Sequence, residues 1–178
     1  MPSKAQRQAV SKTTKRRIIG IDPGLASTGW GVLDCTGGKI LYVAHGHIET
    51  EAALPRAQRL LIIQQSIRSI LSEYKPGEAA IETLYFGKNI SSAIPVAEAR
   101  GVISAALAEK GLVILELTPN AIKQGVVGVL KAEKKQIQEM VKFILNLDEI
   151  PKPDHAADAL GAAICAALSS VKKGGKGK

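Results

Sequence analysis

Short apolar runs alternate with longer amphipathic segments along this chain. The first apolar run ends on an acid and a Pro-Gly turn, and two more strand-like runs follow after short, glycine-containing connections. Connections of this kind are typical of an antiparallel meander. The strands predicted for the meander cover residues 16–22, 29–35 and 39–49.

The rest of the chain alternates predicted helices with two further strands. Residues 54–74 repeat apolar side chains at helical spacing, and a Pro-Gly break precedes the strand predicted at 78–82. The remaining predicted elements are helices at 92–110, 119–125, 132–146 and 155–170 and a strand at 112–117. A meander followed by crossovers predicts an α/β domain whose mixed five-stranded sheet is flanked by helices.

Length and cysteine usage narrow the class of protein. The 178 residues are enough for one domain with a substantial core. No apolar run approaches the ~20 residues that a bilayer span requires, and there is no signal-peptide pattern. Cys35 and Cys165 form no motif with each other, so we expect no disulfide framework and a cytoplasmic location.

The net charge of +8 is concentrated at the two ends of the chain. Residues 1–17 carry six Lys/Arg and no acid, and residues 171–178 carry four Lys and no acid, which leaves 14 basic and 16 acidic residues elsewhere. We expect a disordered basic tail at 1–15, a folded domain at 16–170 and a Lys/Gly-rich tail at 171–178. Such tails would add salt-sensitive attraction to phosphate. A solubilising role, or an organelle transit peptide at the N-terminus, are the alternatives.

Four polar residues stand where predicted elements end or begin. Asp22 ends the first strand and Glu82 the fourth, while His155 and Asp158 share one face of the first turn of the last helix. Small residues would let that helix pack close to the sheet, and if it crosses these strand ends the four side chains converge. Converging acids repel one another unless a cation binds them, and such ligands suit Mg²⁺ or, with a histidine, Mn²⁺. Two such ions can support phosphodiester cleavage.

Each of these residues also has a structural interpretation. Asp22 suits the first position of an Asp-Pro-Gly turn, and Asp158 suits the positive end of a helix. Glu82 could lie at an edge in solvent, and His155 could be structural. Asp154 is interpreted as the N-cap of the last helix.

Taken with their neighbours, four blocks of this sequence resemble the RuvC family of Holliday-junction resolvases. The resemblance runs from about Ile18 to Ser170, and its blocks are IGIDPGLASTGWGV, IETLYFGKNISSAIPVAEARGV, IKQGVVGVLKAEKKQIQEMV and PDHAADALGAAI. It implies a ribonuclease-H-like fold, a homodimer, and Mg²⁺-dependent paired, symmetric nicking of a four-way junction in recombination and DNA repair. It further implies 5′-phosphate and 3′-hydroxyl products, use of two metal ions per site, and cooperation with a junction-binding tetramer and a branch-migration motor.

By motif position, the resemblance assigns the catalytic, metal-binding acids to Asp22, Glu82 and Asp158. His155 falls where family members carry either aspartate or histidine. Its role is therefore open between a metal ligand and a group that transfers a proton near the scissile phosphate.

The resemblance also implies a DNA-contacting loop after the fourth strand. Tyr85 holds the position of an aromatic side chain that stacks on junction bases, and Lys88 and Asn89 follow it in the loop. We interpret the neighbouring Phe86 as a core-facing anchor, and the same anchoring role is the alternative for Tyr85.

Two lysines match family positions near phosphate, Lys123 and Lys134. Independently of the resemblance, residues 119–147 carry five Lys and two Glu, in contrast to the slightly acidic body. A basic rim around an acidic centre is what a nuclease requires, because the rim binds backbone while the acids hold metal.

Two other function classes remain open from the sequence. An Asp-Pro-Gly turn followed by Ser27 and Thr28 could cradle phosphate in an actin-like ATPase, although such enzymes need two lobes and this chain supplies one. A protein that binds junctions or other nucleic acids without cutting them is the second alternative.

Overall fold

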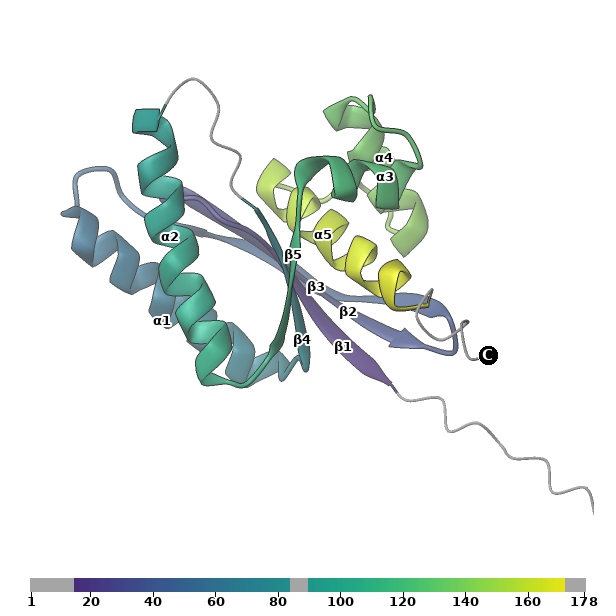
Figure 1. Ribbon diagram of the computed structural model, residues 1–178, viewed down its shortest axis with the longest axis horizontal. Coiled ribbons are helices and arrows are strands. Elements are labelled where there is room, and N and C mark those ends of the chain that lie inside the picture. The colour runs from purple at the N-terminus through teal and green to yellow at the C-terminus, as the bar shows by residue number, and fades with distance from the viewer. Residues whose placement is uncertain (1–14, 84–89, 172–178) are drawn as a thin grey trace, which may run out of the picture.

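A five-stranded sheet organises the computed structural model, which describes residues 15–83 and 90–171 (Figure 1). β1 (Arg16–Asp22) pairs antiparallel with β2 (Ser27–Thr36), which pairs antiparallel with β3 (Lys39–Glu49). On the other side of β1, β4 (Glu78–Glu82) and β5 (Val113–Leu117) add in parallel, giving the order β3-β2-β1-β4-β5. The predicted mixed sheet is confirmed.

Helices cover both faces of this sheet (Figure 1). On one face lie α1 (Arg56–Tyr74) and α2 (Ile90–Glu109). On the other, α5 (Asp154–Val171) crosses the strands, with α3 (Pro119–Val127) and α4 (Lys134–Leu145) packed against it. The order of elements matches the prediction, and the bounds differ by a few residues.

The strand β1 contributes to two apolar cores, one on each face of the sheet. Ile18 packs in the cluster that contains Leu160 of α5, whereas Ile19 and Ile21 pack in the cluster that contains Ile63 of α1. Successive side chains of a strand point to opposite faces, so an uninterrupted apolar run is what a strand covered on both sides requires.

Glycines in β1 and β2 bring α5 close to the sheet. A Cβ added at Gly20 would lie 1.9 Å from the carbonyl oxygen of Ala159, and a Cβ added at Gly29 would lie 1.9 Å from that of His155. No side chain can occupy either place without moving the helix. The absence of a side chain at these two positions therefore lets α5 cross the sheet where it does.

Three basic residues that the sequence grouped with the N-terminus are paired within the fold. Lys15 and Arg17 contact Asp34 at 3.0 and 2.8 Å, and Arg16 contacts Glu78 at 2.6 Å. The remainder of the two predicted tails lies outside the described residues, apart from Val171 in α5. Among the helices of residues 15–83 and 90–171, none is long and apolar enough to cross a membrane.

Candidate active site

Asp22 and Glu82 lie at neighbouring strand ends. In the parallel pair of β1 and β4, Ile21 is opposite Ile81, so the next residue of each strand is an acid at the same edge of the sheet. Both side chains are only partly exposed. The prediction that two acids meet at the carboxyl ends of two strands is confirmed.

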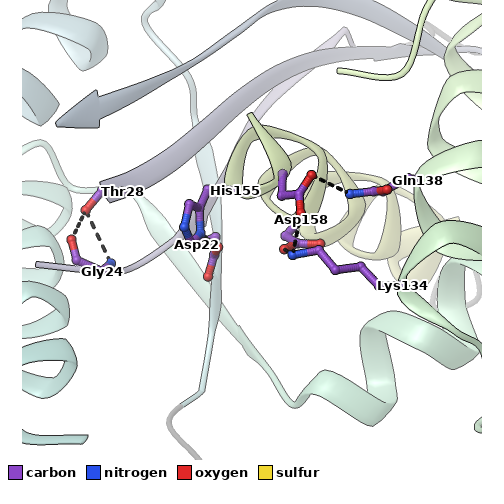
Figure 2. A network of polar contacts seen from close by, with 8 residues as sticks. Asp22, Gly24, Thr28, Lys134, Gln138, His155 and Asp158 are labelled. Atoms are coloured by element: carbon purple, nitrogen blue, oxygen red, sulfur yellow. Dashed lines mark hydrogen bonds and ion pairs between the residues drawn. The ribbon is translucent and has the colours of Figure 1, made fainter. Parts of the chain in front are cut away.

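The turn after Asp22 is closed by Thr28, which is completely buried. Its hydroxyl donates to the carbonyl oxygen of Gly24 at 2.7 Å and accepts the Gly24 N–H at 3.3 Å (Figure 2). These bonds hold the backbone that carries Asp22. Because the Thr28 hydroxyl is buried and bonded to Gly24, it has no access to a phosphate, which removes one basis for the ATPase alternative.

His155 and Asp158 approach from the first turn of α5. The Nδ1 atom of His155 shares a hydrogen bond with Oδ2 of Asp22 at 2.7 Å (Figure 2). Gly29 is the cross-strand partner of Asp22, and its missing side chain allows the His155 backbone to lie beside that strand. Asp22, His155 and Asp158 offer ligand atoms that all lie within 4.8 Å of one another.

Glu82 belongs to the same site but stands outside that compact group. It lines a cavity of about 250 Å³ together with Asp158, Lys123 and Lys134. Burial, and then the charges of Asp22 and Asp158, raise the pKa of Glu82 to about 7. The structure thus gathers all four predicted site residues, three of them at mutual ligand distance.

The electrostatics of the site favour a divalent cation. Burial raises the pKa of Asp22, the hydrogen bond from His155 opposes this, and the charge of Asp158 adds to the rise. At both Asp22 and Glu82 burial is the largest cause of the raised pKa and neighbouring carboxylates add to it, so the protein alone does not fully stabilise the ionised forms. Carboxylates with one imidazole form a donor set that fits such a cation.

A basic rim borders these acids. Lys123 lines the cavity, and the Nζ atom of Lys134 lies 3.2 Å from Oδ2 of Asp158 and 3.2 Å from Oδ2 of Asp154. Partial burial alone would lower the pKa of Lys134, but the two carboxylates outweigh it and raise the pKa. Contact of these lysines with DNA stays a prediction.

The predicted N-cap role of Asp154 is wrong. Asp154 is the first residue of α5, and its carboxylate accepts a hydrogen bond from Gln138 at 3.0 Å and pairs with Lys134. Both partners belong to α4, so the local pattern that suggested a cap could not predict them.

The remaining predicted DNA contacts, at Tyr85, Lys88 and Asn89, lie outside the described residues, as does Phe86. Sequence reasoning missed the positioning roles of Gly29 and Thr28. A glycine inside a strand pattern can indicate close approach of another backbone, and this was the available signal for Gly29.

Comparison with known proteins agrees with this geometry. The family model described as "Crossover junction endodeoxyribonuclease RuvC" matches residues 18–166. A crossover junction endodeoxyribonuclease RuvC of Treponema denticola is 50% identical over 153 residues, which cover 86% of each chain. Its counterpart in Thermotoga maritima is 49% identical over 154 residues, which cover 86% of this chain and 92% of that protein.

A solved structure, T. thermophilus RuvC in complex with Holliday junction substrate, matches with a TM-score of 0.84 and 30% identity. The match covers 89% of this chain and 96% of that one, and it agrees with the predicted ribonuclease-H-like fold. On the family model and these relatives together, the chain belongs to the RuvC family of crossover junction endodeoxyribonucleases.

Proposed function

We propose that this protein resolves four-way DNA junctions by paired, symmetric, metal-dependent nicks that leave 5′-phosphate and 3′-hydroxyl ends. The observation that carries the proposal is the convergence of Asp22, His155 and Asp158, with Glu82 in the same site, in a chain of this family. The T. thermophilus relative was solved with a Holliday junction, which supports this substrate class.

Asp22, Glu82 and Asp158, with His155 beside them, are the residues that would hold Mg²⁺ or Mn²⁺, and we propose two ions per site. Ions bound there supply Lewis-acid chemistry, which activates water and stabilises the leaving oxygen of a phosphodiester. The protein's own contribution begins with rigidity: the loop bonds of Thr28 and the hydrogen bond of His155 hold Asp22 in place.

His155 has two candidate roles that differ in a measurable way. Its Nδ1 atom is engaged by Asp22, so Nε2 is the ring nitrogen left for a further partner. As a proton-transfer group, His155 would accept or donate a proton at Nε2 beside the scissile phosphate. As a ligand, it would contribute to cation affinity, so a His155→Ala variant with unchanged Mn²⁺ affinity would favour proton transfer.

Phosphate and base contacts complete the proposed interface. Lys123 and Lys134 lie beside the acids and would neutralise backbone phosphates. Tyr85, Lys88 and Asn89 follow β4 closely along the chain, and we propose that Tyr85 stacks on a junction base while its neighbours contact the backbone.

Symmetric cutting of two opposed strands requires two active sites, which a two-fold homodimer would provide. We therefore propose a homodimer, acting with a junction-binding tetramer and a branch-migration motor on recombination intermediates in the cytoplasm. The family resemblance is what supports these partners.

Cleavage of a synthetic four-way junction tests this function. The wild type with Mg²⁺ should nick opposed strands symmetrically, chelation should stop the reaction, and Mg²⁺ or Mn²⁺ should restore it. Asp22→Asn should bind the junction but cut it roughly a hundredfold or more slowly, because a ligand charge is removed. Glu51→Gln, which changes an exposed acid, is the matched control.

Two results would change the assignment. Full activity of Asp22→Asn would remove Asp22 from the site. Tight junction binding without cleavage by the wild type, in any divalent cation, would favour the binding protein without catalysis.

A further inference from the structure

Asp154 directs its polar contacts toward α4. Its Oδ2 atom lies 3.2 Å from Nζ of Lys134, and its Oδ1 atom accepts a hydrogen bond from Nε2 of Gln138 at 3.0 Å. Lys134 and Gln138 are four residues apart at the start of α4 and so lie on one face of that helix. Figure 2 shows both side chains reaching toward the start of α5.

Lys134 pairs with two carboxylates, those of Asp154 and Asp158, which have different roles. Its Nζ atom is 3.2 Å from Oδ2 of Asp154 and 3.2 Å from Oδ2 of Asp158. Asp158 belongs to the group that can hold a cation, whereas Asp154 does not. An ammonium group and a divalent cation at the same Asp158 carboxylate repel each other, so cation binding weakens the contact between Lys134 and Asp158.

The Asp154 carboxylate can still pair with Lys134 when Asp158 binds a cation. We propose that Asp154 is a positioning residue that keeps Lys134 at the rim of the site when Asp158 binds a divalent cation. Lys134 then stays available for phosphate without competing for Asp158. This inference rests on the proposed function, because that function supplies the cation and the phosphate.

A charge-removing substitution isolates the effect. Asp154→Asn keeps an oxygen that can accept the Gln138 hydrogen bond but removes the attraction to Lys134. Asp158 then becomes the stronger partner of Lys134, and competition with the cation increases. For a pair as exposed as this one we expect roughly two- to fivefold weaker Mn²⁺ binding. Asp154→Glu retains the charge and should bind Mn²⁺ within about twofold of the wild type.

The experiment is a titration of the full chain with Mn²⁺, without DNA, with free Mn²⁺ read by electron paramagnetic resonance. Lys134→Met should bind Mn²⁺ more tightly than the wild type, because the competing cation is gone. If Asp154 acts through Lys134, adding Asp154→Asn to Lys134→Met should have no further effect. Glu109→Gln is the control, since it removes one acid from an ion pair with Arg68 elsewhere on the surface.

The inference would be overturned if Asp154→Asn bound Mn²⁺ as tightly as the wild type. It would also be overturned if Asp154→Asn weakened Mn²⁺ binding equally in the Lys134→Met background, or if Asp154→Asn bound one Mn²⁺ ion fewer per chain. The second would indicate a general charge effect, and the third would make Asp154 a ligand. A wild type that neither binds Mn²⁺ nor cuts junctions would overturn the proposed function and this inference with it. A wild type that does both, beside an unaffected Asp154→Asn, would overturn this inference alone.

Discussion

Two carboxyl groups of this protein have pKa values on opposite sides of the ordinary range because their neighbours differ. At Asp34, the hydrogen-bonded guanidinium of Arg17 lowers the pKa to about 2. At Glu82, burial and the charges of Asp22 and Asp158 raise the pKa to about 7. The first arrangement stabilises the fold, and the second leaves a carboxyl group that a cation or a proton must neutralise.

The Glu82 shift predicts how stability depends on pH without metal. Its pKa is raised in the fold, so between about pH 4.5 and about 7 the folded state holds a proton that the unfolded state has released, and stability falls as pH rises. Glu82→Gln should remove this dependence. At about pH 8 and with a chelator, we expect its free energy of unfolding to exceed that of the wild type by ~1–2 kcal/mol, allowing for partial solvent screening.

Denaturant unfolding at about pH 8 and about pH 4.5 measures this difference. The two proteins should differ much less at the lower pH, where Glu82 is protonated in the folded state and about half protonated in the unfolded state. An equal stabilisation at both values would contradict the electrostatic cause. Adding Mn²⁺ at the higher pH should stabilise the wild type more than Glu82→Gln, because the ionised carboxylate then has a partner.

At the scale of elements, the position of α5 decides whether the site exists. Asp22 is carried by β1, whereas His155 and Asp158 are carried by α5, so their convergence depends on how that helix lies on the sheet. Gly20 and Gly29 admit its backbone at distances that no Cβ would allow. Two strand glycines thus have a direct effect on active-site geometry.

Gly29→Ala tests this dependence. The added methyl group collides with the backbone at His155, and backbone cannot turn aside as a flexible side chain can. We expect a decrease of ~1–3 kcal/mol in the free energy of unfolding, as for other overpacked sites, and weaker Mn²⁺ binding because His155 and Asp158 move away from Asp22.

Gly101→Ala is the matched control for that substitution. A Cβ at Gly101 meets open space in the helix α2, so this change should stabilise the protein by ~0.5–1 kcal/mol and leave Mn²⁺ affinity unchanged. Equal Mn²⁺ affinity of Gly29→Ala and the wild type would show that α5 is not positioned through this contact.

At the scale of the whole molecule, the site is an acidic centre bordered by basic residues. The acids gather at the carboxyl ends of β1 and β4, the lysines of α3 and α4 border them, and further basic residues lie near the two ends of the sequence. The attraction of the lysines and arginines to phosphate depends strongly on salt concentration, whereas the contacts of the acids with a metal ion operate at short range and are less screened.

Removing residues 1–14 and 172–178 tests the contribution of the ends. If they bind phosphate, the truncated protein should bind junction DNA more weakly. The slope of log affinity against log salt should become shallower by close to one for each phosphate that a removed lysine or arginine had neutralised. Fluorescence anisotropy over a salt series measures this slope. An unchanged slope would support the solubilising role instead.

Much of the architecture could be predicted from residue order. Short apolar runs, IIGI and AAI, identify β1 and β4, and the helical repeat of α1 is equally plain. Element bounds were less exact, because tertiary contacts decide where they end. The α3 helix continues through Gly125 to Val127, and Gly128, whose backbone is left-handed, caps it.

The sequence by itself determined the strand ends that carry Asp22 and Glu82 and the helical spacing of His155 and Asp158, because each depends only on neighbours along the chain. The tertiary structure alone decided which partners these groups meet. Lys134 contacts Asp154 and Asp158, and the backbone of His155 packs against Gly29. The pKa of Glu82 likewise depends on Asp22 and Asp158, which are far from it in sequence. Such contacts depend on burial and distance in three dimensions, which local spacing does not encode.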